Sequence, residues 1–160
     1  MKLDGTIEIA APAAAVWGLI VNPISLSSCM PGVQDIRQVD ERTFEGTVSA
    51  SVGPIDGSFA FRSVMTRAEF PDGLVVQVEG TDSVTRSRVG MEVTASLAER
   101  GSAATALTYH AVVTVKGRLA ILGEMVLRAT AGMMIGEVTK CLRFQLELAG
   151  DGLEAPPVAE

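Results

Sequence analysis

The sequence contains few of the residues that most often carry catalysis, metal binding or covalent cross-links. Its 160 residues include one His, two Cys, one Trp and one Tyr. A single histidine cannot form a histidine metal site, and the sequence offers it no partners for a catalytic triad. Two cysteines are too few for a disulfide scaffold. No run of about 18 uncharged apolar residues occurs, so we expect no transmembrane helix.

Positive charge is also scarce. The chain has 13 basic and 19 acidic residues, a net charge of −6, and no cluster of Lys and Arg, which makes nucleic acid a poor partner. The apolar stretch 10–21 lacks the basic flank of a secretion signal, because Asp4 and Glu8 precede it. We therefore expect a cytoplasmic protein in which Cys29 and Cys141 are reduced, lie far apart and serve as packing residues.

Apolar residues, in contrast, make up 48% of the chain although aromatic residues make up only 4%. This composition excludes a disordered protein, because it can bury enough surface to offset the entropy of the chain. The length fits one domain. We predict a single domain over residues 1–148 and a disordered acidic tail over residues 149–160.

The first thirty residues show one strand and two short helices. Residues 1–9 alternate between apolar and polar types, which predicts a half-buried strand. A helix is predicted over 12–21, because Pro12 suits a first helical turn. Pro23 ends this helix, and a shorter helical segment over 24–30 follows.

The rest of the chain changes period once. Over residues 33–116, apolar and polar residues alternate in six segments that are separated by turn sequences such as 71–73, which predicts six antiparallel strands. The segment 118–148 lacks proline and is predicted to be one long helix. Its first half would place one apolar stripe against the sheet: Leu119, Leu122, Val126, Ala129 and Met133.

This order of elements predicts an α+β fold. A curved antiparallel sheet of seven strands would wrap around the long C-terminal helix, with the two short helices after the first strand. Such an arrangement leaves a cavity between the sheet and the helix. The inward-facing residues form the predicted ligand-binding cavity: Trp17, Phe59, Phe61, Met65, Val76, Met91, Val93, Tyr109, Val113, Leu119, Leu122, Val126 and Met133.

The methionines have two interpretations. Met125, Met133 and Met134 on the helix, with Met65 and Met91 on strands, are either core filler or an adaptable lining for a flexible apolar ligand.

Glycine and positive charge in and beside the long helix also leave alternatives open. Gly123 and Gly136 either allow a close backbone approach or leave room for a ligand. Lys116 and Arg118 either mark a solvated helix end or, together with Met30 and Pro31, form a pocket mouth or a partner contact.

No catalytic residue or metal ligand is predicted. The alternation places His110 on the outer face of the sheet, opposite Tyr109, and no carboxylate pair stands out for acid–base chemistry. Tyr109 is the one obvious polar side chain that would point inward.

Several short motifs resemble one family. They are Pro12 with Val16-Trp17 and Leu19; Cys29-Met30-Pro31-Gly32; Glu45-Gly46-Thr47-Val48 followed by Val52-Gly53-Pro54-Ile55; and Gly117-Arg118-Leu119-Ala120-Ile121-Leu122-Gly123. At these spacings the chain resembles, over about residues 1–147, the CoxG family of carbon monoxide dehydrogenase subunits. That family belongs to the START-like (SRPBCC) helix-grip superfamily of proteins that bind hydrophobic ligands.

The resemblance implies a non-enzymatic protein that acts beside molybdenum–copper CO dehydrogenase and recruits it to the membrane or the respiratory chain. Electrons from CO oxidation must reach quinone, which is a membrane lipid. We therefore expect a bound lipophilic molecule such as menaquinone or ubiquinone, no obligatory cofactor, and a place in the cytoplasm, at the inner face of the membrane. The acidic tail would be repelled by anionic lipid, so anchoring through it is not expected.

Two alternatives remain. One is a recruitment or assembly factor for a molybdenum hydroxylase whose cavity is filled by side chains. The other is a small cyclase or hydrolase, which the same superfamily also contains and which would depend on Tyr109.

Overall fold

The computed structural model describes the backbone over residues 1–154 and the side chains over residues 1–148. The elements are β1 (Lys2–Ile9), α1 (Ala13–Ile20), α2 (Pro23–Ser27), β2 (Val33–Gln38), β3 (Thr43–Val52), β4 (Ile55–Glu69), β5 (Gly73–Asp82), β6 (Ser87–Glu99), β7 (Thr105–Lys116), α3 (Arg118–Ile121) and α4 (Glu124–Glu154). The helix α4 extends into the region predicted as a tail. The remainder of that prediction, residues 155–160, lies outside the described residues.

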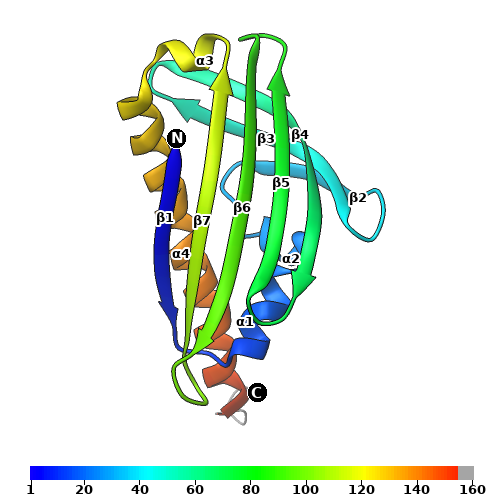
Figure 1. Cartoon of the computed structure of the whole chain (residues 1–160), viewed down its shortest axis with the longest axis vertical. Coiled ribbons are helices and arrows are strands. Elements are labelled where there is room, and N and C mark those ends of the chain that lie inside the picture. The colour runs from blue at the N-terminus through cyan, green and yellow to red at the C-terminus, as the bar shows by residue number, and fades with distance from the viewer. Residues whose placement is uncertain (155–160) are drawn as a thin grey trace.

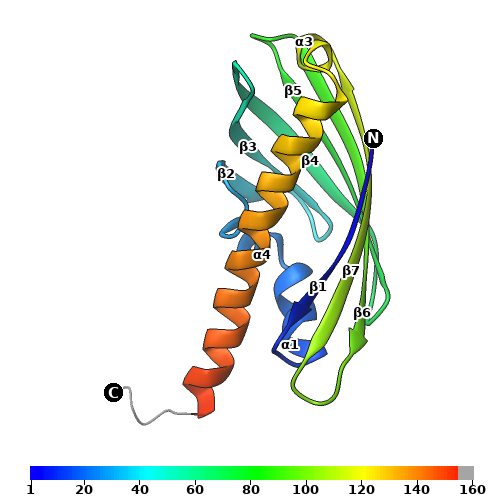
Figure 2. The same cartoon turned by 90° about the vertical axis from the view of Figure 1, so that its left-hand side faces the viewer.

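Seven antiparallel strands form one curved sheet in the order β1-β7-β6-β5-β4-β3-β2. The helix α4 crosses the concave side of this sheet, and α1 and α2 lie at the end of the sheet near the C-terminal half of α4 (Figures 1 and 2). The predicted fold is therefore confirmed. Alternation along the strands produced this result, because a strand that alternates has one apolar face and that face must be covered.

The predicted single helix over 118–148 is wrong at its start. Gly123 has a φ of +88°, a left-handed conformation that ends α3 and separates it from α4. The two helices have different axes, so the phase of α3 does not continue into α4. As a consequence Met133 is 74% exposed and Met125 is 85% exposed, whereas Val126 and Leu127 pack inward.

The expected inward stripe is therefore wrong at Ala129 and Met133, which are both exposed. The other expectations for glycine are also changed. A Cβ at Gly123 or Gly136 would have no neighbour within 4 Å, so no close backbone approach explains either one. The positive φ accounts for Gly123, and nothing in the structure explains Gly136.

The apolar core consists of two separate clusters. One lies where β1, α1 and the far end of α4 meet, and its most buried members include Ile9, Val16 and Leu146. The other lies around α3 and the start of α4, and it is built on Phe59 and Leu119. The long helix therefore has a buried anchor near each end.

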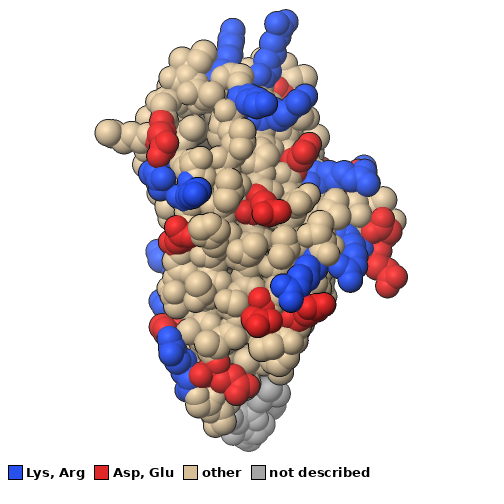
Figure 3. Space-filling model, viewed as in Figure 1, with Lys and Arg blue, Asp and Glu red and all other residues tan. Residues whose placement is uncertain are grey.

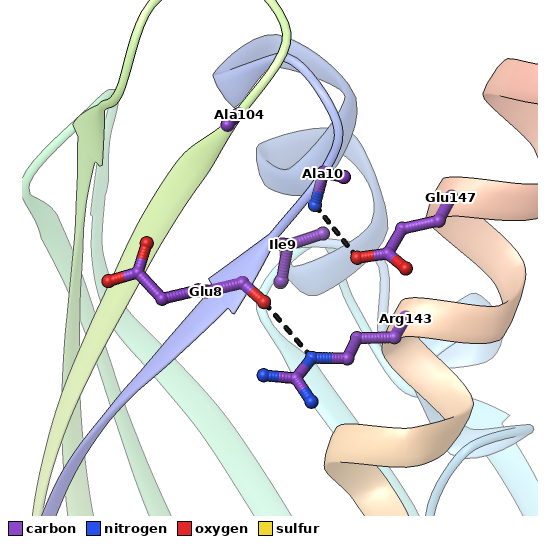
Figure 4. Close-up of a pocket in the computed structure, with 6 residues that line it drawn as sticks. All are labelled: Glu8, Ile9, Ala10, Ala104, Arg143 and Glu147. Carbon is purple, nitrogen blue, oxygen red and sulfur yellow. Dashed lines mark hydrogen bonds between the residues drawn. The ribbon is translucent and has the colours of Figure 1, made fainter.

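Polar contacts tie α4 to the edge strand β1 and the segment that follows it. Near the start of α4, Arg128 donates to the carbonyl oxygen of Lys2 over 3.0 Å. Near its end, Arg143 donates to the carbonyl oxygen of Glu8 over 3.0 Å, and Glu147 accepts from the backbone N–H of Ala10 over 2.8 Å (Figure 4).

The two cysteines are paired, contrary to prediction. Cys29, which follows α2, and Cys141 on α4 form a disulfide with a Cα–Cα distance of 5.3 Å. The prediction that they are reduced and lie apart is wrong, because it rested on a sequence separation of 112 residues. The fold brings the end of α2 against α4, where Gln145 also donates to the hydroxyl of Ser28 over 3.0 Å.

Candidate functional site

The middle of the concave face is an apolar floor that is only half-buried. Phe61, Val78, Met91 and Val93 belong to neither core cluster, and each retains partial exposure although it lies on the inner face of the sheet. The helix α4 approaches the sheet most closely at the edge strand β1 and at β3, not over these central strands. We call this section, defined by these four residues, the groove floor.

Glycine on the inner face keeps the aromatic rings low. Phe61 on β4 is paired with Gly46 on β3 and with Gly80 on β5. A Cβ at Gly46 would lie 3.1 Å from the ring of Phe61, so the ring covers this glycine. Likewise, a Cβ at Gly5 would lie 2.7 Å from the ring of Tyr109, its partner across β1 and β7. Rings that lie along the sheet leave space beneath α4.

An opening of about 210 Å³ lies between β3 and α4. Its lining is mostly small or flexible: Pro31, Gly32, Ser49, Ala50, Ser51, Thr130, Met133 and Met134. Ala50 is on the inner face of β3, four residues from Gly46, which is about 13 Å at the rise of a strand. The opening therefore leads along β3 toward Phe61.

A second depression, of about 330 Å³, is polar and lies at the far end of α4. It is lined by Glu8, Ile9, Ala10, Ala104, Arg143 and Glu147 (Figure 4). Its Arg143 and Glu147 already bond to the backbone of β1 and of the segment after it. None of the predicted cavity residues lines it, and its contacts explain it as an anchor of α4.

The predicted cavity residues fall into three groups. Eight of them pack in or against the two core clusters: Trp17, Phe59, Met65, Val76, Tyr109, Leu119, Leu122 and Val126. Phe61, Met91 and Val93 lie in the groove floor, beside the buried Val113. Met133 lies at the rim of the opening. The structure thus places twelve of the residues inside, and their contact with a ligand stays a prediction.

The four residues of the predicted mouth are not brought together. Pro31 lines the opening, whereas Lys116 and Arg118 lie at the far end of β7 and the start of α3 and do not line it. Met30, beside Pro31, does not line it either. Sequence reasoning missed Gly32, Ser49, Ser51 and Thr130 as lining residues. The Pro31-Gly32 pair was the available signal, since Gly32 has a φ of +82° and abuts the backbone of Ser49.

Ionisable groups are found outside the groove. His110 is on the outer face, as predicted, where it contacts Asp4. The backbone N–H of Arg42 lowers the pKa of Asp40, and the backbone N–H of Val84 lowers the pKa of Asp82; both carboxylates lie at turns. Over the described part of the chain, no three His, Cys, Asp or Glu residues gather as a metal site would require.

A curved sheet that grips a long helix over a half-buried apolar floor defines a helix-grip protein of the START-like class. The family model of CoxG, described as a component of carbon monoxide dehydrogenase, matches residues 5–147, and the chain belongs to this family. No helix within residues 1–154 combines the length and the apolar character needed to cross a membrane.

Solved structures agree on the fold. A conserved protein from Geobacillus kaustophilus is 21% identical with a TM-score of 0.86, over 93% of this chain and 97% of that one. A START superfamily protein from Mycobacterium smegmatis is 16% identical with a TM-score of 0.65, over 92% and 98%. The Zhui aromatase/cyclase from Streptomyces sp. R1128 is 14% identical with a TM-score of 0.61, over 92% and 93%. No curated protein matches the sequence at a significant level.

Proposed function

We propose that this protein is a non-enzymatic carrier that binds a lipophilic molecule, a respiratory quinone such as menaquinone, in the groove between the sheet and α4. Through this ligand it links a molybdenum CO dehydrogenase to the membrane and the respiratory chain, on the cytoplasmic side. The observation that carries the proposal is the groove floor. An interior that served folding alone would be filled by side chains, because protein cores are close-packed.

The chemistry of the floor suits a flat apolar ring. Phe61 offers an aromatic surface, and Met91 offers a flexible, polarisable one. Met133 and Met134 at the opening can adapt to the flexible prenyl chain that quinones carry. Association with a CO dehydrogenase is what membership of the CoxG family implies for this chain.

A single polar substitution in the floor tests ligand binding. Met91→Gln places an amide on the apolar floor, and we expect the affinity for a short-chain quinone to fall about tenfold, because the amide must give up water without gaining a partner. Titration calorimetry or quenching of Trp17 fluorescence measures the affinity. Val112→Gln, on the outer face of the neighbouring strand β7, is the matched control and should bind as the wild type does.

Two results would count against the carrier. One is a protein that, purified from its own host, holds no extractable lipid and binds no quinone. The other is equal binding by both variants. A complex with the dehydrogenase that forms without any quinone, and persists in the Met91→Gln variant, would instead favour a recruitment factor. Exposed apolar side chains on the outer face of α4, such as Phe144 at 67% exposure, supply a surface for that alternative.

A further inference from the structure

One end of the molecule combines exposed apolar side chains with positive charge. We call this surface the basic tip, and it consists of Val84, Arg86, Arg88, Lys116, Arg118, Ile121 and Met125. Its three apolar members are 84%, 82% and 85% exposed, more than the other large apolar side chains of the described chain. Figure 3 shows Lys and Arg gathered at this end, where α3 and the β5–β6 turn lie in Figure 1.

The tip is one continuous surface. Arg88 on β6 is paired directly with Lys116 on β7. A Cβ at Gly117 would lie 2.8 Å from the Cα of Ser87, so the start of α3 sits against the β5–β6 turn. The hydroxyl of Ser87 also accepts from the backbone N–H of Leu119 over 3.0 Å. Four cations and three apolar side chains are therefore held together on two segments far apart in sequence.

Internal hydrogen bonds fix the turn that presents Val84. The carboxylate of Asp82 is buried and accepts from the backbone N–H of Val84 over 2.9 Å and from the hydroxyl of Thr85 over 3.1 Å. A turn that is fixed in this way keeps Val84 outward, so its exposure does not come from a loose loop. The apolar side chain is held in water at a cost that the fold itself does not explain.

Charge distinguishes the tip from the rest of the surface. The whole chain has a net charge of −6, yet four of its 13 basic residues are in the tip. Among nearby acids, Asp82 is directed inward and Glu124 is paired with Arg128 over 2.9 Å. Asp56, in the neighbouring β3–β4 hairpin, accepts from Ser51. The tip is thus a positive patch on a negative protein.

We propose that the basic tip docks the protein on an anionic lipid surface. Val84, Ile121 and Met125 enter the headgroup layer, and the cations lie among the lipid phosphates. The inference rests on the proposed function, since a carrier of a membrane lipid must meet the membrane. The geometry agrees, because Met125 is eight residues from Met133 at the groove opening, about 12 Å along α4.

Sedimentation of the full chain with lipid vesicles tests the docking. We expect binding to phosphatidylcholine vesicles that contain about 30% phosphatidylglycerol and not to phosphatidylcholine alone. Binding should weaken about tenfold or more between about 0.05 M and about 0.5 M NaCl.

Two tip variants separate the contributions of charge and apolar contact. Arg86→Gln, Arg88→Gln, Lys116→Gln and Arg118→Gln together should reduce binding about tenfold or more. Ile121→Ser with Met125→Ser should remove the binding that persists at high salt. The charge control replaces Arg37, Arg62, Arg67 and Lys140 by Gln, and the apolar control is Phe144→Ser with Leu148→Ser. Thermal unfolding shows that each variant is folded.

The outcomes are decisive in both directions. Binding that is lost in the tip variants and kept in the controls supports the docking. No binding to anionic vesicles overturns it, as does equal loss in tip and control variants, and an acidic protein partner would then explain the tip. Quinone titration in the absence of lipid keeps the two proposals apart, because the tip variants should bind quinone normally. A wild type that binds vesicles but no quinone would refute the carrier and leave the docking intact.

Discussion

Gly5 and Gly46 determine how deep the groove can be. Each lies on the inner face of the sheet, directly across from an aromatic residue whose ring covers it. A larger side chain at either position would push the ring toward α4 and into the groove. The smallest residues of the sheet are therefore as important to the floor as the aromatic ones.

Asp82 makes the stability of the β5–β6 turn depend on pH. Hydrogen bonds to its carboxylate, chiefly from the backbone N–H of Val84, hold its pKa below the ordinary value of 3.8. A lowered pKa in the folded state means that the carboxylate stabilises the fold above the ordinary pKa and stops doing so as the pH falls through the lowered one.

We therefore predict a pH-dependent difference between the wild type and Asp82→Asn. The wild type should have the higher free energy of unfolding, by a constant amount above about pH 5, and the difference should shrink below about pH 4. Urea unfolding followed across this range measures it, with Asp56→Asn as an exposed control. A difference that does not change with pH would show that the charge of Asp82 is irrelevant.

The helix α4 is held at its ends and free over its middle. Its first turns contact α3 and the β3–β4 turn, and its last turns contact α1, β1 and the segment after α2. The turns between them cover the groove floor. An element fixed in this way can change its distance from the sheet without leaving either anchor.

The Cys29–Cys141 disulfide should contribute measurably to that anchoring. A cross-link between residues 112 apart restricts the unfolded chain, and we predict that Cys29→Ser with Cys141→Ser lowers the free energy of unfolding by about 2–4 kcal/mol. Urea unfolding with and without reductant measures the effect. Reductant should lower the wild type to the level of the variant and leave the variant unchanged. Two reactive thiols in the native protein would contradict the cross-link.

Over the whole molecule, the two core clusters leave the centre incompletely filled, and a ligand in the groove would join them. We predict that a quinone at one hundred times its dissociation constant raises the free energy of unfolding by about 2.7 kcal/mol, because only the folded protein binds it. Thermal unfolding with and without the quinone measures the shift. The Met91→Gln variant should show a much smaller shift at the same concentration, and an equal one would place the ligand elsewhere.

The pattern of the sequence predicted the fold because alternation is a local signal. The strand faces, the turn at 71–73 and the outward position of His110 all depend on neighbours a few residues away. The faces of Phe61 and Met91 were predictable for the same reason. What could not be predicted was the break at Gly123, because a glycine within a helical pattern is compatible with both a continued helix and a left-handed end.

The parts of the site that depend on long-range packing were also out of reach. The pairing of Cys29 with Cys141 and the opening between β3 and α4 depend on how α2 and its following segment settle against a helix about a hundred residues away. The basic tip is a similar case, since Arg86 and Arg118 come together only through the packing of Gly117 on the β5–β6 turn.

The disulfide has a topological consequence. Strands β2 to β7, α3 and the first half of α4 all lie between Cys29 and Cys141, so they form one covalent ring closed by the sulfur atoms. A protease that cuts this ring once converts it into a branched chain of unchanged mass, apart from one water molecule, and releases no fragment. Loss of a piece of the sheet needs either two cuts or one cut and a reductant.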